Sequence, residues 1–156
     1  MKPMKLASMV VGFSVVALSL GSTAAYAAGG QVDGSITVAG STCTWTNATT
    51  SDVPPNTLTI DHTTLTPSCT GSINASLTND PTVTFDDTAG TASAPEVDVA
   101  ATVVGINCGY KVTNLSVTRD GTTRAYAGSS YTATKISGGI LCPSTESVDS
   151  VSLTFH

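Results

Sequence analysis

The 156-residue chain has few charged residues, few aromatic side chains and only two histidines. Charged residues make up 11% of it, against roughly 25% in an ordinary soluble domain. Lys, Arg, Glu and Gln commonly cover the exposed faces of helices, so their scarcity disfavours a helical fold. The net charge of −5 does not supply the basic surface that nucleic-acid binding requires, so we expect no nucleic-acid partner. Two His and four Cys leave little room for an elaborate metal centre.

Hydroxyl-bearing residues replace the missing charge, because the chain contains 27 Thr and 19 Ser. They alternate with Val, Ile and Leu over short segments, which is the two-residue period of half-buried strands. The segments predict strands at residues 31–38, 43–46, 56–60, 72–77, 82–85, 96–104, 110–118, 123–127, 131–136 and 147–155. Such strands are typical of an all-β fold, either a two-sheet Ig-like β-sandwich or a small β-barrel.

The last predicted strand alternates clearly between apolar and polar residues. Val151, Leu153 and Phe155 fall on one face and are expected to be buried, whereas Val148 falls on the opposite face. Segment 88–95 is short of large apolar side chains, and we expect it to connect two strands. Residues 127–130 (Ala-Gly-Ser-Ser) predict a turn.

The first 27 residues have the pattern of a cleaved signal peptide. Lys2 and Lys5 precede an apolar stretch over residues 6–20, and Ala25-Tyr26-Ala27 forms a cleavage pattern. The apolar stretch is shorter than the roughly 20 residues that a membrane-spanning helix needs. We therefore expect a secreted, extracellular protein with one domain over residues 28–156. The mature chain keeps four basic and eleven acidic residues, a net charge of −7, which disfavours binding to anionic membranes.

All four cysteines lie in the predicted mature region, where an even number indicates disulfides. We favour Cys43–Cys69 and Cys108–Cys142, because each pair closes a loop within one half of the chain. The other connectivities remain open at this point. No C-x-x-C spacing occurs, so a redox pair or a zinc site is disfavoured.

The residues that commonly carry catalysis are nearly absent. His62 follows Asp61, but neighbouring residues of a strand point to opposite faces, and no G-x-S-x-G elbow is present. Paired carboxylates for glycoside hydrolysis usually line an aromatic cleft, for which the chain has few aromatic residues. We therefore expect a non-enzymatic protein without a cofactor or a catalytic residue.

A calcium site is left open by one acidic segment. Oxygen ligands within eight residues are the kind that Ca²⁺ prefers, although the EF-hand pattern is absent. The same residues are also typical of turns and strand ends. The four residues are Asn79, Asp80, Asp86 and Asp87.

The aromatic residues indicate one core position and one candidate partner patch. Trp45 lies two residues after Cys43, so both side chains are expected on one face and in the core. Tyrosines beside a loop are common in protein-recognition surfaces. The candidate partner patch consists of Tyr126, Tyr131, Arg124 and Lys135.

Two segments around the second cysteine pair carry a resemblance. Cys108-Gly109-Tyr110 and Gly138-Gly139-Ile140-Leu141-Cys142-Pro143 resemble a C-x-Y … G-G-x-x-C-P pattern of small secreted actinobacterial all-β proteins of unassigned function. The resemblance covers the C-terminal third of the chain. In outline the chain is also similar to chromophore carriers of the neocarzinostatin type, which are acidic, exported, all-β and four-cysteine proteins with shorter disulfide loops. The alternating segment 31–38 and the penultimate Phe155 are similar to features of chaperone–usher pilins.

These observations favour a secreted, non-enzymatic binding or assembly module. We expect it to engage an extracellular protein partner through a strand edge or a loop patch. Two alternatives are a carrier of a small ligand in a cleft, of the neocarzinostatin type, and an inhibitor of a secreted hydrolase.

Overall fold

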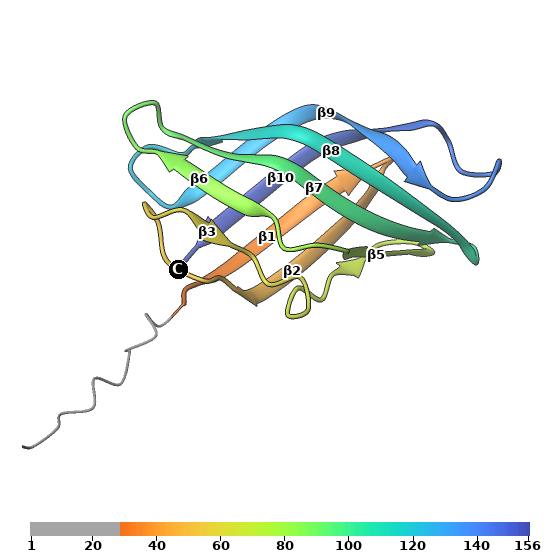
Figure 1. Cartoon of the computed structure of the whole chain (residues 1–156), viewed down its shortest axis with the longest axis horizontal. Coiled ribbons are helices and arrows are strands. Elements are labelled where there is room, and N and C mark those ends of the chain that lie inside the picture. Colours follow the sequence, from red (N-terminus) through yellow and green to blue (C-terminus); the bar gives the residue numbers. More distant parts are fainter. Residues whose placement is uncertain (1–28) are drawn as a thin grey trace, which may run out of the picture.

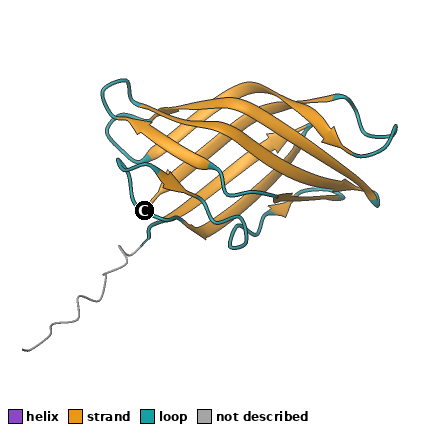
Figure 2. Cartoon of the chain, viewed as in Figure 1, coloured by secondary structure: helices purple, strands orange, loops and turns teal. Residues whose placement is uncertain are grey.

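The computed structural model describes residues 29–156, which form ten β-strands (Figures 1 and 2). This part of the chain contains no helix, and so none that is long and apolar enough to span a membrane. The predicted signal peptide, residues 1–27, lies outside the described residues. The strands are β1 (Gln31–Val38), β2 (Ser41–Thr49), β3 (Leu58–Thr59), β4 (Ser68–Cys69), β5 (Ile73–Leu77), β6 (Thr82–Asp86), β7 (Thr91–Val103), β8 (Ile106–Arg119), β9 (Ala125–Ser137) and β10 (Thr145–Phe155).

All strands belong to one curled sheet in the order β3-β6-β7-β8-β9-β10-β1-β2-β4, and β5 pairs with β7. Every pairing is antiparallel. The sheet closes on itself where Thr50, after β2, forms a bridge with Ile60, after β3. Two backbone hydrogen bonds of 2.9 Å, Ser51 N to Thr59 O and Asp61 N to Thr49 O, complete this contact. The all-β prediction is therefore confirmed, with one continuous sheet in place of two separate ones.

The two ends of the curled sheet differ. We call the end with the Thr50–Ile60 bridge the closed end, and here the rings of Phe85, Tyr126 and Phe155 pack with centroids 5.1 to 5.9 Å apart. We call the other end the open end. The β1–β2, β7–β8 and β9–β10 connections lie there, and Figure 1 shows the last two at the right. The open end therefore consists of connections between paired strands.

The buried face of several long strands changes midway. In β10, Val151, Leu153 and Phe155 are 6%, 7% and 4% exposed, which confirms the prediction for this face. Val148 was expected on the opposite face, yet it is only 2% exposed. Neighbouring strands contain irregular backbone at the same level, with φ of 63° at Ser130 in β9 and 53° at Asn114 in β8. Such irregularities increase the twist and coil a strand, so one strand contributes both faces to the interior.

Two segments expected to be connections belong to strands. Residues 91–95 form the start of β7 and pair with β6 and β8, where Ala92 and Ala94 are 1% and 3% exposed. Pro95 takes no place in the register with β8, as expected for a residue without an N–H group. Residues 127–130 continue β9 against β10 and form no turn. Small residues fit a tightly curled sheet, which local hydrophobicity does not reveal.

Both predicted disulfides, Cys43–Cys69 and Cys108–Cys142, are present. Cys43 and Cys69 are directly opposite each other in β2 and β4. Cys108–Cys142 joins β8 to the β9–β10 connection at the open end. Each closes a loop of a length that stabilises a chain by roughly 3–4 kcal/mol in the chain-entropy model. Two such disulfides are typical of proteins that fold in an oxidising compartment.

Candidate functional site

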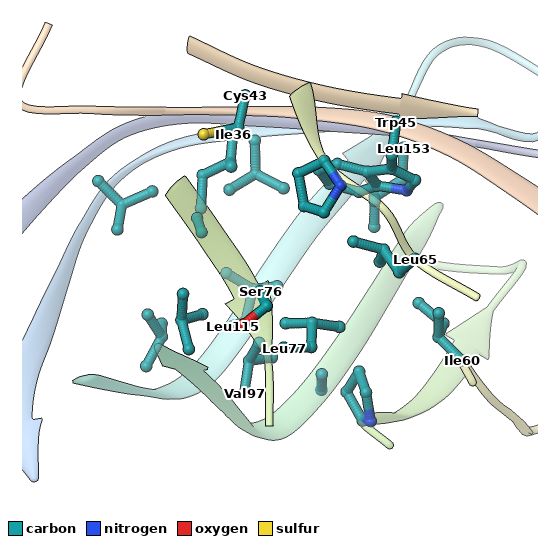
Figure 3. Close-up of a pocket in the computed structure, with 18 of the residues that line it drawn as sticks. Ile36, Cys43, Trp45, Ile60, Leu65, Ser76, Leu77, Val97, Leu115 and Leu153 are labelled. Carbon is teal, nitrogen blue, oxygen red and sulfur yellow. The ribbon is translucent and has the colours of Figure 1, made fainter. Parts of the chain in front are cut away.

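The interior of the curled sheet contains two adjoining cavities. The smaller has a volume of about 100 Å³, and the larger, toward the open end, about 330 Å³. Figure 3 shows side chains around the smaller cavity, with Ile36 and Trp45 on one side and Leu77 and Leu115 on the other. The residues that line both cavities are Ile36, Cys43, Ala75, Val99, Val112 and Val148. The two spaces therefore share a wall along the middle of the sheet.

The larger cavity exists because the side chains that face it are too short to fill the space. Ala75 of β5, Ala101 of β7 and Ala133 of β9 all line it. A small closed sheet has an interior just wide enough to be filled by side chains or to hold one small ligand. With aromatics at 5% of the sequence, few side chains are large enough to fill this interior. The cavity volume falls at the lower limit of the roughly 300–1,000 Å³ typical of ligand pockets.

Exposed apolar side chains surround the mouth of the larger cavity. Val104, in the β7–β8 connection, is 80% exposed and also lines the cavity. Leu141, in the β9–β10 connection, is 71% exposed and lines it too. Residues that are both exposed and lining lie where the cavity meets solvent. The Cys108–Cys142 disulfide attaches the β9–β10 connection, which contains Leu141, to β8.

Polar side chains are few around the larger cavity. Ser41, Tyr110 and Glu146 are the ones that line it. The Tyr110 hydroxyl donates a hydrogen bond to the carbonyl oxygen of Pro143 at 3.2 Å. Burial raises the pKa of Tyr110 above its ordinary value, and the negative charge of Glu146 raises it further. The cavity is therefore an apolar space with a small number of polar groups, a composition typical of ligand sites.

Trp45 lies in the wall of the smaller cavity, as its spacing from Cys43 predicted. It packs on Gly34 of β1, where an added Cβ would collide with the indole ring. Its buried Nε1 has no hydrogen-bond partner within residues 29–156. Because it is the only tryptophan of the chain, its fluorescence reports on this part of the interior.

The four residues of the candidate partner patch do not form an exposed patch. Tyr126 is 2% exposed and belongs to the core, which corrects the expectation that it is available to a partner. Tyr131 also packs against the core, and its hydroxyl donates to the carbonyl oxygen of Ser116. Lys135 Nζ donates to the carbonyl oxygen of Cys142 at 3.1 Å. The change of buried face within β9 directs both tyrosines inward, and no local signal predicts it.

Arg124, the fourth residue of the patch, binds Asp87 across the closed end. Its two terminal nitrogens donate to the two carboxylate oxygens at 2.7 and 3.0 Å, and Arg119 adds a contact at 2.9 Å. The hydrogen bond from Arg124 holds the pKa of Asp87 below its ordinary value, and the charges of both arginines contribute. This two-pronged geometry gives Arg124 a structural role between β6 and β9.

His62 pairs with Asp80, and not with the adjacent Asp61. Its Nδ1 lies 2.6 Å from Asp80 Oδ1, which also accepts the His62 backbone N–H at 2.9 Å. These bonds lower the pKa of Asp80. A carboxylate oxygen of Asp61 lies within 4.8 Å of ligand-type atoms of His62 and Asp80, and Asp61 Oδ1 accepts two hydrogen bonds from Thr63. In the described part of the chain no hydroxyl group forms a hydrogen bond with His62.

The four candidate calcium ligands are held by four different neighbours. Asn79 Oδ1 accepts the backbone N–H of Asp98, and Asp80 binds His62. Asp86 Oδ1 accepts the N–H groups of the turn that follows it. Asp87 binds the two arginines described above. The structure gives each of these residues a local role in a turn or an ion pair.

Comparisons with known proteins give no match to a family model, a curated protein or a solved structure. The case for a function therefore rests on the geometry of residues 29–156.

Proposed function

We propose that the protein is an extracellular, non-enzymatic carrier that holds a small apolar ligand inside its curled sheet. The observation that carries this proposal is the larger cavity, with its apolar walls and its opening between the β7–β8 and β9–β10 connections. Carriage of a small ligand is one of the alternatives that the sequence favours. Binding to an extracellular protein partner stays a prediction, and the residues selected for it are engaged within the domain.

The chemistry of the cavity favours an apolar ligand over water. Its volume of about 330 Å³ corresponds to roughly ten water molecules at about 30 Å³ each. Only three lining side chains are polar, so these waters would hydrogen-bond mainly to one another and gain few hydrogen bonds from the walls. An apolar molecule that enters the cavity would remove apolar wall from water, at about 25 cal/mol for each Å². The free energy of transfer thus drives binding of a compact apolar molecule.

Secretion fits the same function. The predicted signal peptide would export the chain, and the two disulfides would keep the sheet curled around its cavity outside the cell. A carrier outside the cell binds an apolar molecule that is poorly soluble in water.

The direct test is a binding titration of the mature protein with 1-naphthylmethanol, a compact neutral apolar probe. At about 0.5 kcal/mol for each of roughly twelve non-hydrogen atoms, the binding free energy reaches about −6 kcal/mol. This corresponds to a Kd on the order of tens of micromolar. Isothermal titration calorimetry measures it, and Trp45 fluorescence gives a second signal. Absence of binding at millimolar probe would refute the proposal.

A variant that fills the cavity tests where the probe binds. Ala75 lines both cavities, and Ala75→Phe places a ring in their shared wall, so we expect at least a tenfold loss of affinity. Ala127→Phe adds the same ring at an exposed position of β9 and serves as the matched control. Ala101→Leu, a smaller change in the larger cavity, replaces Ala75→Phe if that variant fails to fold. Unchanged affinity in both filled variants would contradict binding inside the sheet.

A further inference from the structure

Glu146 is the one acidic side chain among the mainly apolar residues that line the larger cavity. It lies in β10 opposite Ala133 of β9, and both residues line the larger cavity. Its side chain is partly buried. Among residues 29–156 no side chain or backbone group forms a hydrogen bond or an ion pair with its carboxylate. No Lys, Arg or His nitrogen of residues 29–156 therefore lies within 4.0 Å of the Glu146 carboxylate.

Two polar side chains near Glu146, Tyr110 and Lys135, already form hydrogen bonds within the domain. The Tyr110 hydroxyl donates to Pro143, and the ammonium group of Lys135, at the same end of the sheet, donates to the carbonyl oxygens of Gly139 and Cys142. Lys111 pairs with Glu96 and lies 3.8 Å from Asp98. The contribution of Glu146 to the raised pKa of Tyr110 agrees with its position beside the cavity. The capacity of Glu146 to accept hydrogen bonds is thus left for a ligand.

We propose that the ligand is an apolar amine whose cationic group pairs with Glu146 while its apolar body occupies the larger cavity. The inference rests on the proposed carrier function and names the chemical class of the ligand. Glu146 lines the cavity among mainly apolar side chains, so a cation bound there can form a charge-assisted hydrogen bond with its carboxylate. Hydrogen bonds between charged groups are about twice as strong as neutral ones, so the pair also selects against uncharged ligands. An anionic ligand of the same shape is repelled.

Three naphthyl probes of similar size and different charge test the inference at pH 7. They are 1-naphthylmethylamine, which is cationic, 1-naphthylmethanol, which is neutral, and 1-naphthoate, which is anionic. For the native mature chain we expect calorimetry to give a Kd at least tenfold lower for the amine than for the alcohol, and the weakest binding for naphthoate. In Glu146→Gln the amine should bind no better than the alcohol, while the affinity of the alcohol changes less than threefold.

The matched control is Asp149→Asn, which removes one negative charge from an exposed position of the same strand. This variant should keep the preference for the amine. Glu146→Asp keeps the charge and should keep a preference, and the unchanged binding of the alcohol shows that each variant is folded.

The outcomes separate this inference from the carrier function. If the alcohol and the amine bind the native chain equally, the carrier function stands and the role of Glu146 is wrong. If Glu146→Gln and Asp149→Asn weaken the amine by the same factor, the preference reflects net charge and the inference is overturned. If no probe binds, the carrier function fails and the inference fails with it.

Discussion

The contact between Gly34 and Trp45 gives the sharpest stability prediction. A Cβ added at Gly34 would lie against Cζ2 of the indole and 2.6 and 2.8 Å from Cε2 and Cη2. The indole ring is rigid and cannot bend away from the added Cβ, so the whole Trp45 side chain has to shift against the core on which it packs. Gly→Ala within a strand otherwise stabilises by roughly 0.5–1 kcal/mol, whereas overpacking costs about 1–3 kcal/mol. We expect Gly34→Ala to lower the free energy of unfolding by about 1–2 kcal/mol.

Urea denaturation followed by far-UV circular dichroism measures this change. Gly139→Ala is the matched control, because no heavy atom within 4 Å would meet a Cβ there and its φ is not positive. That variant should be neutral or slightly more stable. Trp45 fluorescence should shift in Gly34→Ala alone, since only that substitution displaces the indole.

A second background isolates the cause. In Trp45→Leu the indole ring is absent, so adding Gly34→Ala should lower the free energy of unfolding by less than about 0.5 kcal/mol. The difference between this cost and the cost in the native chain is the coupling free energy between the two residues, which is typically about 0.5–3 kcal/mol for residues in contact. The explanation is refuted if Gly34→Ala costs the same with and without the indole, or if it matches the control at Gly139.

Two further changes probe other parts of the fold. Replacing Cys108 and Cys142 together by Ala removes a disulfide that joins residues 34 positions apart. The free energy of unfolding, measured in urea, should fall by about 4 kcal/mol. A decrease of less than about 1 kcal/mol would contradict the chain-entropy model. The Arg124 hydrogen bond holds the pKa of Asp87 below its ordinary value of 3.8, so the pair stabilises the fold above that pH and loses its effect as the pH falls through the lower folded pKa. Asp87→Asn should therefore lower the Tm at pH 7. In thermal scans, the Tm difference between the variant and the native chain should become smaller as the pH falls from 4 to 2.5. A Tm difference that does not depend on pH would contradict this explanation.

Local sequence patterns determined the class of fold and its disulfides. The predicted segment 31–38 coincides with β1, because it alternates between apolar and polar residues and contains β-branched side chains. The pairs Cys43–Cys69 and Cys108–Cys142 were favoured because each closes a loop within one half of the chain, and the structure confirms this pairing over the other connectivities. The signals for a strand lie within a few residues of it, so a local pattern is enough to predict β1, whereas each disulfide joins residues 26 or 34 positions apart.

The candidate site is different, because its parts come from strands far apart in the chain. Ala75, Ala101 and Ala133 are unremarkable small residues in the sequence, yet the curled sheet turns all three toward one cavity. The sequence signal for a space inside the sheet was the scarcity of aromatic residues, and Glu146 was not identified from the sequence.

The sequence by itself determined an all-β, disulfide-bonded chain with little charge and few large side chains. Only the tertiary structure decided that this chain curls into one sheet around a cavity, because curling depends on backbone irregularities such as those at Asn114 and Ser130. The same irregularities turned Tyr126 into the core and brought Val148 to the cavity wall. Which face of a strand is buried depends on the twist of the strands around it. The two-residue period within one segment does not contain information about that twist, so it cannot predict the buried face along the whole strand.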